Sequence, residues 1–143
     1  MKLITLAIAL LSVSAFAADK PGSAKVTGTV IAPKAVKDIA GLTLELRLYE
    51  YDPMLAGGSA TLVAKLRMND VAHKKGKETK TKFTLAEGAS IMPRRSYYLT
   101  CFVIDAKGKR YLMGEKDGKR GLCKVLANGN PNKVNLILRD LRR

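Results

Sequence analysis

The run LTLELRL, from Leu42 to Leu48, has a leucine at every second position and a polar or charged residue between leucines. Successive side chains on a β-strand point to opposite faces, so this alternation indicates a strand with one buried and one solvent-facing side. The run VNLIL, residues 134–138, repeats the pattern with Val134, Leu136 and Leu138. These two segments predict a β-sheet protein with one apolar core.

Outward from these runs, short segments rich in Val, Leu, Thr, Tyr and Phe alternate with clusters of Gly, Pro, Asn, Asp and Lys. This spacing is typical of β-sandwiches and barrels. We expect an all-β fold, an antiparallel sandwich of the immunoglobulin or transthyretin type with about seven or eight strands. The expected strands are 24–31, 42–51, 60–68, 79–85, 97–104, 109–114, 121–126 and 133–139.

The segment YYLTCFVI, residues 97–104, is apolar on both faces. A strand covered on both faces is normally central in its sheet, so we expect this segment at the centre of the core. Its aromatic side chains either pack or, at Tyr98 and Phe102, form a surface that stacks a ligand. Turns are expected at 105–108 and 127–132, where Gly, Asn and Pro gather.

The N-terminal residues, 1–17, predict a secretory signal peptide. A single charge at Lys2 precedes an apolar run, residues 3–13, and Ala15 and Ala17 are the small residues that a signal peptidase recognises. The run is short for a membrane span, and we expect no transmembrane segment in the mature chain, residues 18–143. Cleavage near Ala17 would leave one periplasmic or secreted domain, with an uncleaved anchor as the alternative.

Positive charge is the main feature of the composition. The 143 residues include 26 basic and 12 acidic side chains, a net charge of +14, while 47% hydrophobic residues exclude a disordered polycation. If the basic segments 73–82 and 107–124 lie on one face, they form a patch that attracts polyanions. Otherwise they solubilise the protein and guard strand edges. The candidate anion-binding residues are Lys74, Lys75, Lys77, Lys80, Lys109, Arg110, Lys119 and Arg120.

Export restricts the partners of such a surface. We expect no nucleic-acid partner, because the protein would leave the cytoplasm and its basic segments lack the interleaved aromatic residues that stack bases. Lipid headgroups, acidic polysaccharides and an acidic envelope protein each remain suitable. The segment 49–58, with Tyr49, Tyr51 and a diglycine, is either a strand end or a loop for contact with a protein or small ligand.

Cys101 and Cys123 are the only cysteines. An oxidising compartment permits a disulfide between them, and such a bridge would stabilise the fold by about 3 kcal/mol. Two buried free thiols are the alternative.

The sequence holds no recognisable catalytic or metal-binding motif. His73 is the only histidine and falls in a basic segment, expected to be a loop, without a carboxylate to orient its ring. One histidine, two cysteines and dispersed methionines do not complete a zinc or copper site. We therefore expect no enzyme activity, metal or cofactor.

Several runs together resemble the exported β-sandwich family of YbaY-like proteins and YscW-like type III secretion lipoprotein chaperones. The similarity extends over residues 24–138, and the runs that carry it are VTGTV at 26–30, LTLELRL at 42–48, KFTL at 82–85, SYYLTCFVIDAKG at 96–108, KVLANGNP at 124–131 and KVNLIL at 133–138.

The resemblance implies a compact antiparallel sandwich in the cell envelope, without enzyme activity. Members of the chaperone branch help to localise or assemble a secretin, and they are usually lipoproteins. This chain lacks an acceptor cysteine after its cleavage region, residues 15–19. Residues and resemblance together predict an exported binding or envelope-assembly module. The alternative is a purely structural accessory domain with a solubilising surface.

Overall fold

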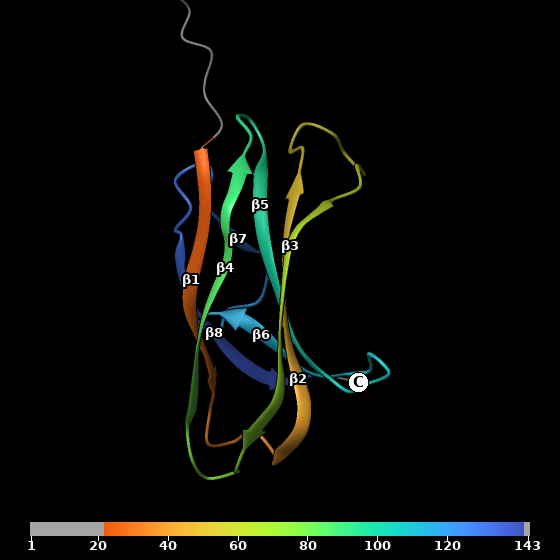
Figure 1. The fold of residues 1–143 in the computed structure, drawn as a ribbon, viewed down its shortest axis with the longest axis vertical. Helices are drawn as coiled ribbons and strands as arrows, with labels where there is room; N and C mark the ends of the chain where they lie inside the picture. The colour runs from red at the N-terminus through yellow and green to blue at the C-terminus, as the bar shows by residue number, and fades with distance from the viewer. Residues whose placement is uncertain (1–21, 142–143) are drawn as a thin grey trace, which may run out of the picture.

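The computed structural model describes residues 22–141, and the expected signal peptide, residues 1–17, lies outside them. The described chain is all-β, as expected, and every expected strand is present with shifted ends (Figure 1). The strands are β1 (Gly22–Ala32), β2 (Ile39–Tyr51), β3 (Thr61–His73), β4 (Thr79–Ile91), β5 (Ser96–Ile104), β6 (Arg110–Lys116), β7 (Cys123–Val125) and β8 (Lys133–Asp140).

The strands form one continuous sheet that curls until it nearly closes. Its order is β3-β2-β5-β6-β8-β1-β4, with β7 paired to β5 beside this path. The two end strands, β3 and β4, are joined by a short turn and approach each other without a regular ladder. The apolar side chains of all strands therefore face a common, barrel-like interior, which contains the core.

One strand pair corrects the expectation of an antiparallel sandwich. β1 and β8 run parallel, with Gly28 opposite Val134 and Val30 opposite Leu136, while the other pairs are antiparallel. The sheet is therefore mixed, and it curls instead of separating into two antiparallel layers. The alternation of apolar residues predicted which side of each strand is buried, but it contains no information on strand direction.

β5 is the central strand, as the sequence predicted. It lies between β2 on one side and β6 and β7 on the other, and its inward side chains Tyr97, Leu99, Cys101 and Val103 are buried. On the outer face, Tyr98 stacks on Tyr49 with ring centroids 5.2 Å apart. The tyrosines of this face thus pack against one another.

β3 and β4 continue beyond their expected ends. β3 runs to His73 and β4 to Ile91, although the sequence favoured ends at Met68 and Leu85. Asp70 in β3 and Ala86 in β4 have positive φ angles of 55° and 61°, which mark local irregularities. Such irregularities let a strand bend and resume pairing after a break in its apolar alternation.

The outer face of β2 is less exposed than its alternating pattern indicates. Glu45 is only 6% exposed, because Arg47 and Arg67 cover it at 2.7 Å and 3.6 Å from its carboxylate oxygens. The two guanidinium groups lie on β2 and on the neighbouring strand β3. A charge placed in a sheet face is thus compensated across the strands.

The close approach of β1 to β8 requires glycine at position 28. A β-carbon at Gly28 would overlap the carbonyl oxygen of Val134 and lie 2.9 Å from the ring of Phe83. We expect Gly28→Ala to lower the free energy of unfolding by about 2–3 kcal/mol or more, since the backbones must separate. Urea denaturation followed by circular dichroism measures this, with Thr29→Ala as the control on the same strand. Equal stability of both variants would contradict the parallel pairing.

Both cysteines are buried and unbridged in the structure. Cys123 lies opposite Leu99 on adjacent strands, so it faces the same side of the sheet as Cys101. Burial raises the pKa of the Cys101 thiol to about 12 and that of Cys123 to about 11. The positions meet the requirement for adjacent strands, and the disulfide stays a prediction.

We expect protein recovered from an oxidising compartment to be lighter than reduced protein by two hydrogen atoms, as measured by intact mass. After reduction, the folded protein should react slowly with a thiol reagent at about pH 8 and faster as pH rises, because only the thiolate reacts. Full labelling of unreduced protein in denaturant would exclude the bridge.

Candidate anion-binding surface

Strand direction brings several basic segments to one end of the barrel. β1, β3, β5 and β8 end there, and β2, β4 and β6 begin there. In Figure 1 the β1–β2 loop and the β3–β4 turn lie at the bottom, and the β5–β6 turn projects to the right above them, beside the C-terminal label. Segments 33–38, 74–78 and 105–110, with Asp140, contribute eight basic and four acidic side chains to this surface, the cationic end.

The β1–β2 loop lies against the β3–β4 turn. The carboxylate of Asp38 accepts hydrogen bonds from the Lys75 backbone N–H at 2.8 Å and from Lys74 Nζ at 3.1 Å. The Gly76 N–H donates to the Lys34 carbonyl at 2.8 Å. The two hydrogen bonds to its carboxylate hold the pKa of Asp38 below its ordinary value, chiefly through the Lys75 N–H. The acid group therefore remains ionised and fixes the turn.

The β5–β6 turn is organised by Asp105 in the same way. Its carboxylate accepts hydrogen bonds from the backbone N–H groups of Lys107 and Lys109, each at 2.9 Å, and from the Tyr111 hydroxyl at 3.3 Å. The Lys109 N–H is the main cause of its lowered pKa. The expected turn at 105–108 is confirmed by the hydrogen bond from the Gly108 N–H to the Asp105 carbonyl.

The structure gathers some of the candidate cations and separates others. Lys74, Lys75, Lys77, Lys109 and Arg110 lie at the cationic end. Lys80 is the second residue of β4, opposite Ile31, so it borders the cationic end and pairs there with Glu78 at 3.2 Å. Lys119 and Arg120 lie in the segment between β6 and β7. β6 ends at Lys116, which lies opposite Leu136 in the middle of β8, so this segment leaves the sheet away from the cationic end.

Sequence reasoning missed Lys37 and Tyr111. The Lys37 ammonium lies 5.8 Å from the centroid of the Tyr111 ring, and the Lys109 ammonium lies 5.4 Å from the same centroid. These contacts join the β1–β2 loop to the β5–β6 turn. The signal available in the sequence was the pair of lysines in PKAVKD, residues 33–38, between two expected strands.

His73 is buried at the end of β3, which corrects the expectation that it lies in a loop. Its Nδ1 lies 2.9 Å from the Thr79 hydroxyl, and its Nε2 lies 3.2 Å from the Val36 carbonyl oxygen. A carbonyl only accepts, so Nε2 carries a proton, and in the neutral ring the hydroxyl donates to Nδ1. The ring therefore holds the β3–β4 turn to the β1–β2 loop, with both nitrogens engaged.

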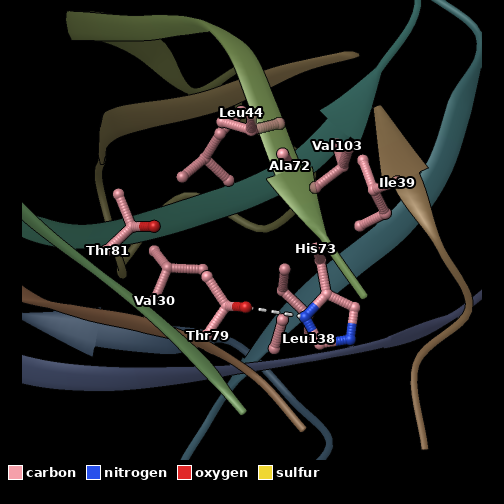
Figure 2. Close-up of a pocket in the computed structure, with 11 residues that line it drawn as sticks. Val30, Ile39, Leu44, Ala72, His73, Thr79, Thr81, Val103 and Leu138 are labelled. Carbon is pink, nitrogen blue, oxygen red and sulfur yellow. Dashed lines mark hydrogen bonds between the residues drawn. The ribbon is translucent and has the colours of Figure 1, made fainter. Parts of the chain in front are cut away.

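Figure 2 shows this ring among the residues that line a small cavity between the β3 and β4 edges. The cavity has a volume of about 30 Å³, which suits about one water molecule. Its other walls are mainly apolar, including Leu44, Val103 and Leu138. Its size and lining make it part of the core packing.

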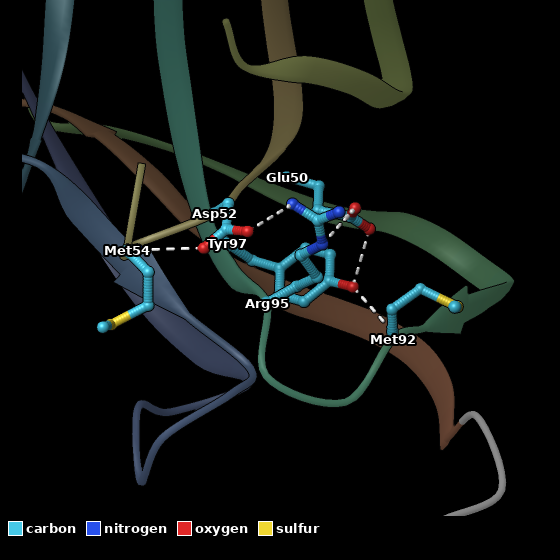
Figure 3. Close-up of polar contacts among 6 residues, drawn as sticks. All are labelled: Glu50, Asp52, Met54, Met92, Arg95 and Tyr97. Atoms are coloured by element: carbon cyan, nitrogen blue, oxygen red, sulfur yellow. Dashed lines mark hydrogen bonds and ion pairs between the residues drawn. The ribbon is translucent and has the colours of Figure 1, made fainter. Parts of the chain in front are cut away.

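The opposite end of the barrel has a different character. Arg95 contacts Glu50 at 3.6 Å and Asp52 at 3.3 Å, and the Tyr97 hydroxyl donates to Glu50 at 2.9 Å (Figure 3). This network joins the β2–β3 loop to the β4–β5 turn. Within the β2–β3 loop, Met54 is 87% exposed. The segment 49–58 is thus the end of β2 followed by a partly apolar loop that this network holds in place.

Other site chemistry is limited within the described chain. Residues 22–141 contain no group of three or more His, Cys, Asp or Glu side chains placed to hold a metal ion. No helix in this range has the length and hydropathy needed to cross a lipid bilayer.

The fold and its surface define a small, barrel-like all-β protein with a cationic end. No protein-family model and no curated protein matches the chain. Among solved structures, an alternative pilotin from the type II secretion system of Vibrio cholerae has a similar fold, with a TM-score of 0.56 and 18% identity. The match covers 83% of this chain and 97% of the pilotin. At this identity the likeness shows a common fold.

The Thr79 hydroxyl should contribute to stability through His73. We expect Thr79→Val to lower the free energy of unfolding by about 1–3 kcal/mol, because it leaves the buried Nδ1 without its donor. Thr81→Val is the matched control, since Thr81 lines the same cavity. Urea denaturation at neutral pH compares the two. Equal destabilisation would contradict the assigned role of the Thr79–His73 hydrogen bond.

Proposed function

We propose that the protein is a non-enzymatic binding module of the cell envelope that contacts an anionic partner through its cationic end. The observation that supports this best is the gathering of three basic segments at one end. They come from positions far apart in the sequence, and the fold places them together. A field of one sign over a continuous surface attracts anions and increases their rate of association.

The acidic side chains of this end do not cancel its charge. Asp38 and Asp105 accept backbone N–H groups within the turns, so their position is set by the fold. The ammonium groups of Lys75, Lys77 and Lys107 extend from the same turns, and these residues are exposed. The turns at the opposite end, 52–60, 92–95 and 126–132, contain only two arginines and one aspartate. The turns of the cationic end therefore contain more positive charge than the turns of the opposite end.

The similar fold of the pilotin supports an envelope role. A pilotin belongs to a secretion system, and the V. cholerae protein shows that this fold serves there. We infer that this chain likewise acts in envelope assembly after export, with residues 1–17 removed. A partner of either kind, an envelope protein or an anionic lipid or polysaccharide, would meet the cationic end first.

The gathering of basic segments at one end predicts that two matched double variants lose different amounts of anion binding. Lys75→Gln with Lys77→Gln removes two charges from the cationic end, and Lys119→Gln with Arg120→Gln removes two from elsewhere. We expect the first pair to weaken binding to heparin or anionic vesicles about fivefold at low salt, at about 0.5 kcal/mol per exposed contact. The second pair should change it by less than about twofold, and salt should weaken all binding.

Elution from heparin and vesicle co-sedimentation over a salt series measure the difference. Equal losses in the two variants would mean that only total charge matters, which favours a solubilising surface. Retention of the wild type no stronger than that of a neutral β-barrel would contradict the proposal.

A further inference from the structure

A β-bulge at the start of β6 turns two neighbouring side chains toward the same surface. Val103 of β5 lies opposite Leu112, but the next residue, Ile104, lies opposite Arg110, so the register shifts at Tyr111. Bulges re-aim side chains and are frequent beside functional sites. Arg110 and Tyr111 both line a surface hollow of about 530 Å³, whose other walls are Lys37, Lys109, Asp140 and Leu141.

Aromatic rings position the three cations of this hollow. The ammonium groups of Lys37 and Lys109 lie within 5.8 Å of the Tyr111 ring centroid. The Arg110 guanidinium lies 4.0 Å from the centroid of Phe102. Cation–π contacts orient a charged group without neutralising it, so they leave its hydrogen-bond donors available to a carboxylate or a ligand.

The charged side chains that line the hollow sum to a net charge of +2. The one carboxylate in its lining belongs to Asp140, whose Oδ1 lies 3.5 Å from Lys37 Nζ. The Asp105 carboxylate lies outside the lining and accepts hydrogen bonds from two backbone N–H groups and the Tyr111 hydroxyl. A ligand that balances the remainder carries nearly two negative charges and enough oxygens for several donors. A phosphate monoester has a charge of about −1.5 to −2 at neutral pH and three acceptor oxygens. A single carboxylate supplies about half that charge and two oxygens.

We propose that this hollow binds a phosphate monoester group. The guanidinium of Arg110 donates to two of its oxygens as a fork, and the ammonium groups of Lys37 and Lys109 contact the remaining face. This proposal rests on the proposed function, because it names the chemistry that the cationic end recognises. The hollow would hold the ligand at a defined position, whereas the rest of the cationic end only attracts anions over a distance.

The test is an NMR titration of the mature chain with inorganic phosphate, compared with chloride at equal ionic strength. We expect saturable shifts of the backbone amides of Lys37 and residues 109–111 with phosphate and not with chloride. In Lys109→Gln with Arg110→Gln, the affinity should fall about tenfold or more, because two charge-assisted hydrogen bonds are lost. The matched control, Lys75→Gln with Lys77→Gln, removes the same charge from the same end and should change it less than about twofold.

A third variant tests the charge balance. Asp140→Asn removes the carboxylate that competes for Lys37, so we expect it to raise the affinity for phosphate several-fold. Urea denaturation of each variant verifies that it is folded. If Lys109→Gln with Arg110→Gln proves unstable, Lys37→Gln replaces it, and its affinity should also fall at least about fivefold. Unchanged affinity in Asp140→Asn, or equal losses in the two lysine-containing double variants, would overturn the proposal.

Two further probes distinguish the source of the phosphate. Vesicles with phosphatidic acid present a monoester, and vesicles with phosphatidylglycerol at equal surface charge present a diester. Stronger binding to phosphatidic acid supports a lipid headgroup, and binding of glucose 6-phosphate with competition against inorganic phosphate supports a phosphorylated sugar. Equal binding to both vesicles, without saturable phosphate shifts, overturns the hollow as a site while leaving the anionic-partner proposal intact.

Discussion

The parallel contact between β1 and β8 is the constraint on which the other features depend. β1 pairs with β4 on its other side, and β8 pairs with β6, so this one contact joins the β1–β4 pair to the remaining strands in a single curled sheet. The contact exists because Gly28 lets the Val134 backbone approach more closely than any side chain permits. With β1 and β8 parallel, both strands finish at the same end as β3 and β5. The basic segments that follow or flank those strands are gathered there by topology, not by their own affinity for one another.

A surface with so many cations has to be held against its own repulsion. The structure does this with short-range hydrogen bonds within the loops: Asp38 and Asp105 bind backbone N–H groups, and His73 joins Thr79 to the Val36 carbonyl. Each acid organises one turn and offsets part of the repulsion between neighbouring lysines. At the other end, Glu50 and Asp52 pair with Arg95 in turns that contain few other charged residues, so little net charge remains there. The difference between the two ends thus comes from the larger number of lysines and arginines in the turns of the cationic end.

Much of the fold could be predicted from local pattern. Alternation at 42–48 and 134–138, the doubly apolar run at 97–104 and the turn at 105–108 all predicted structure that is present, because side-chain periodicity and turn chemistry are local. Strand direction was not predictable, since Val134 and Leu136 face the core whether β8 runs parallel or antiparallel. His73 was misplaced because its partners, Val36 and Thr79, lie on other segments and its neighbours are lysines. Lys37 and Tyr111 were missed for the same reason: the sequence separates by more than seventy residues what a bulge and a loop bring together.

A fold shared with the pilotin does not by itself distinguish a charged surface from a binding site. A TM-score of 0.56 at 18% identity means that backbone architecture is common to this chain and the V. cholerae pilotin, while most surface side chains differ. Architecture gives a barrel whose turns collect at two ends; the residues in those turns determine what each end contacts. Here the long-range field of the cationic end and the fixed positions of Lys37, Lys109 and Arg110 act at different distances. The field acts over about a Debye length of 8–10 Å and falls with salt. The aromatic rings act only at contact, so in the proposed site they would supply the selectivity that charge alone lacks.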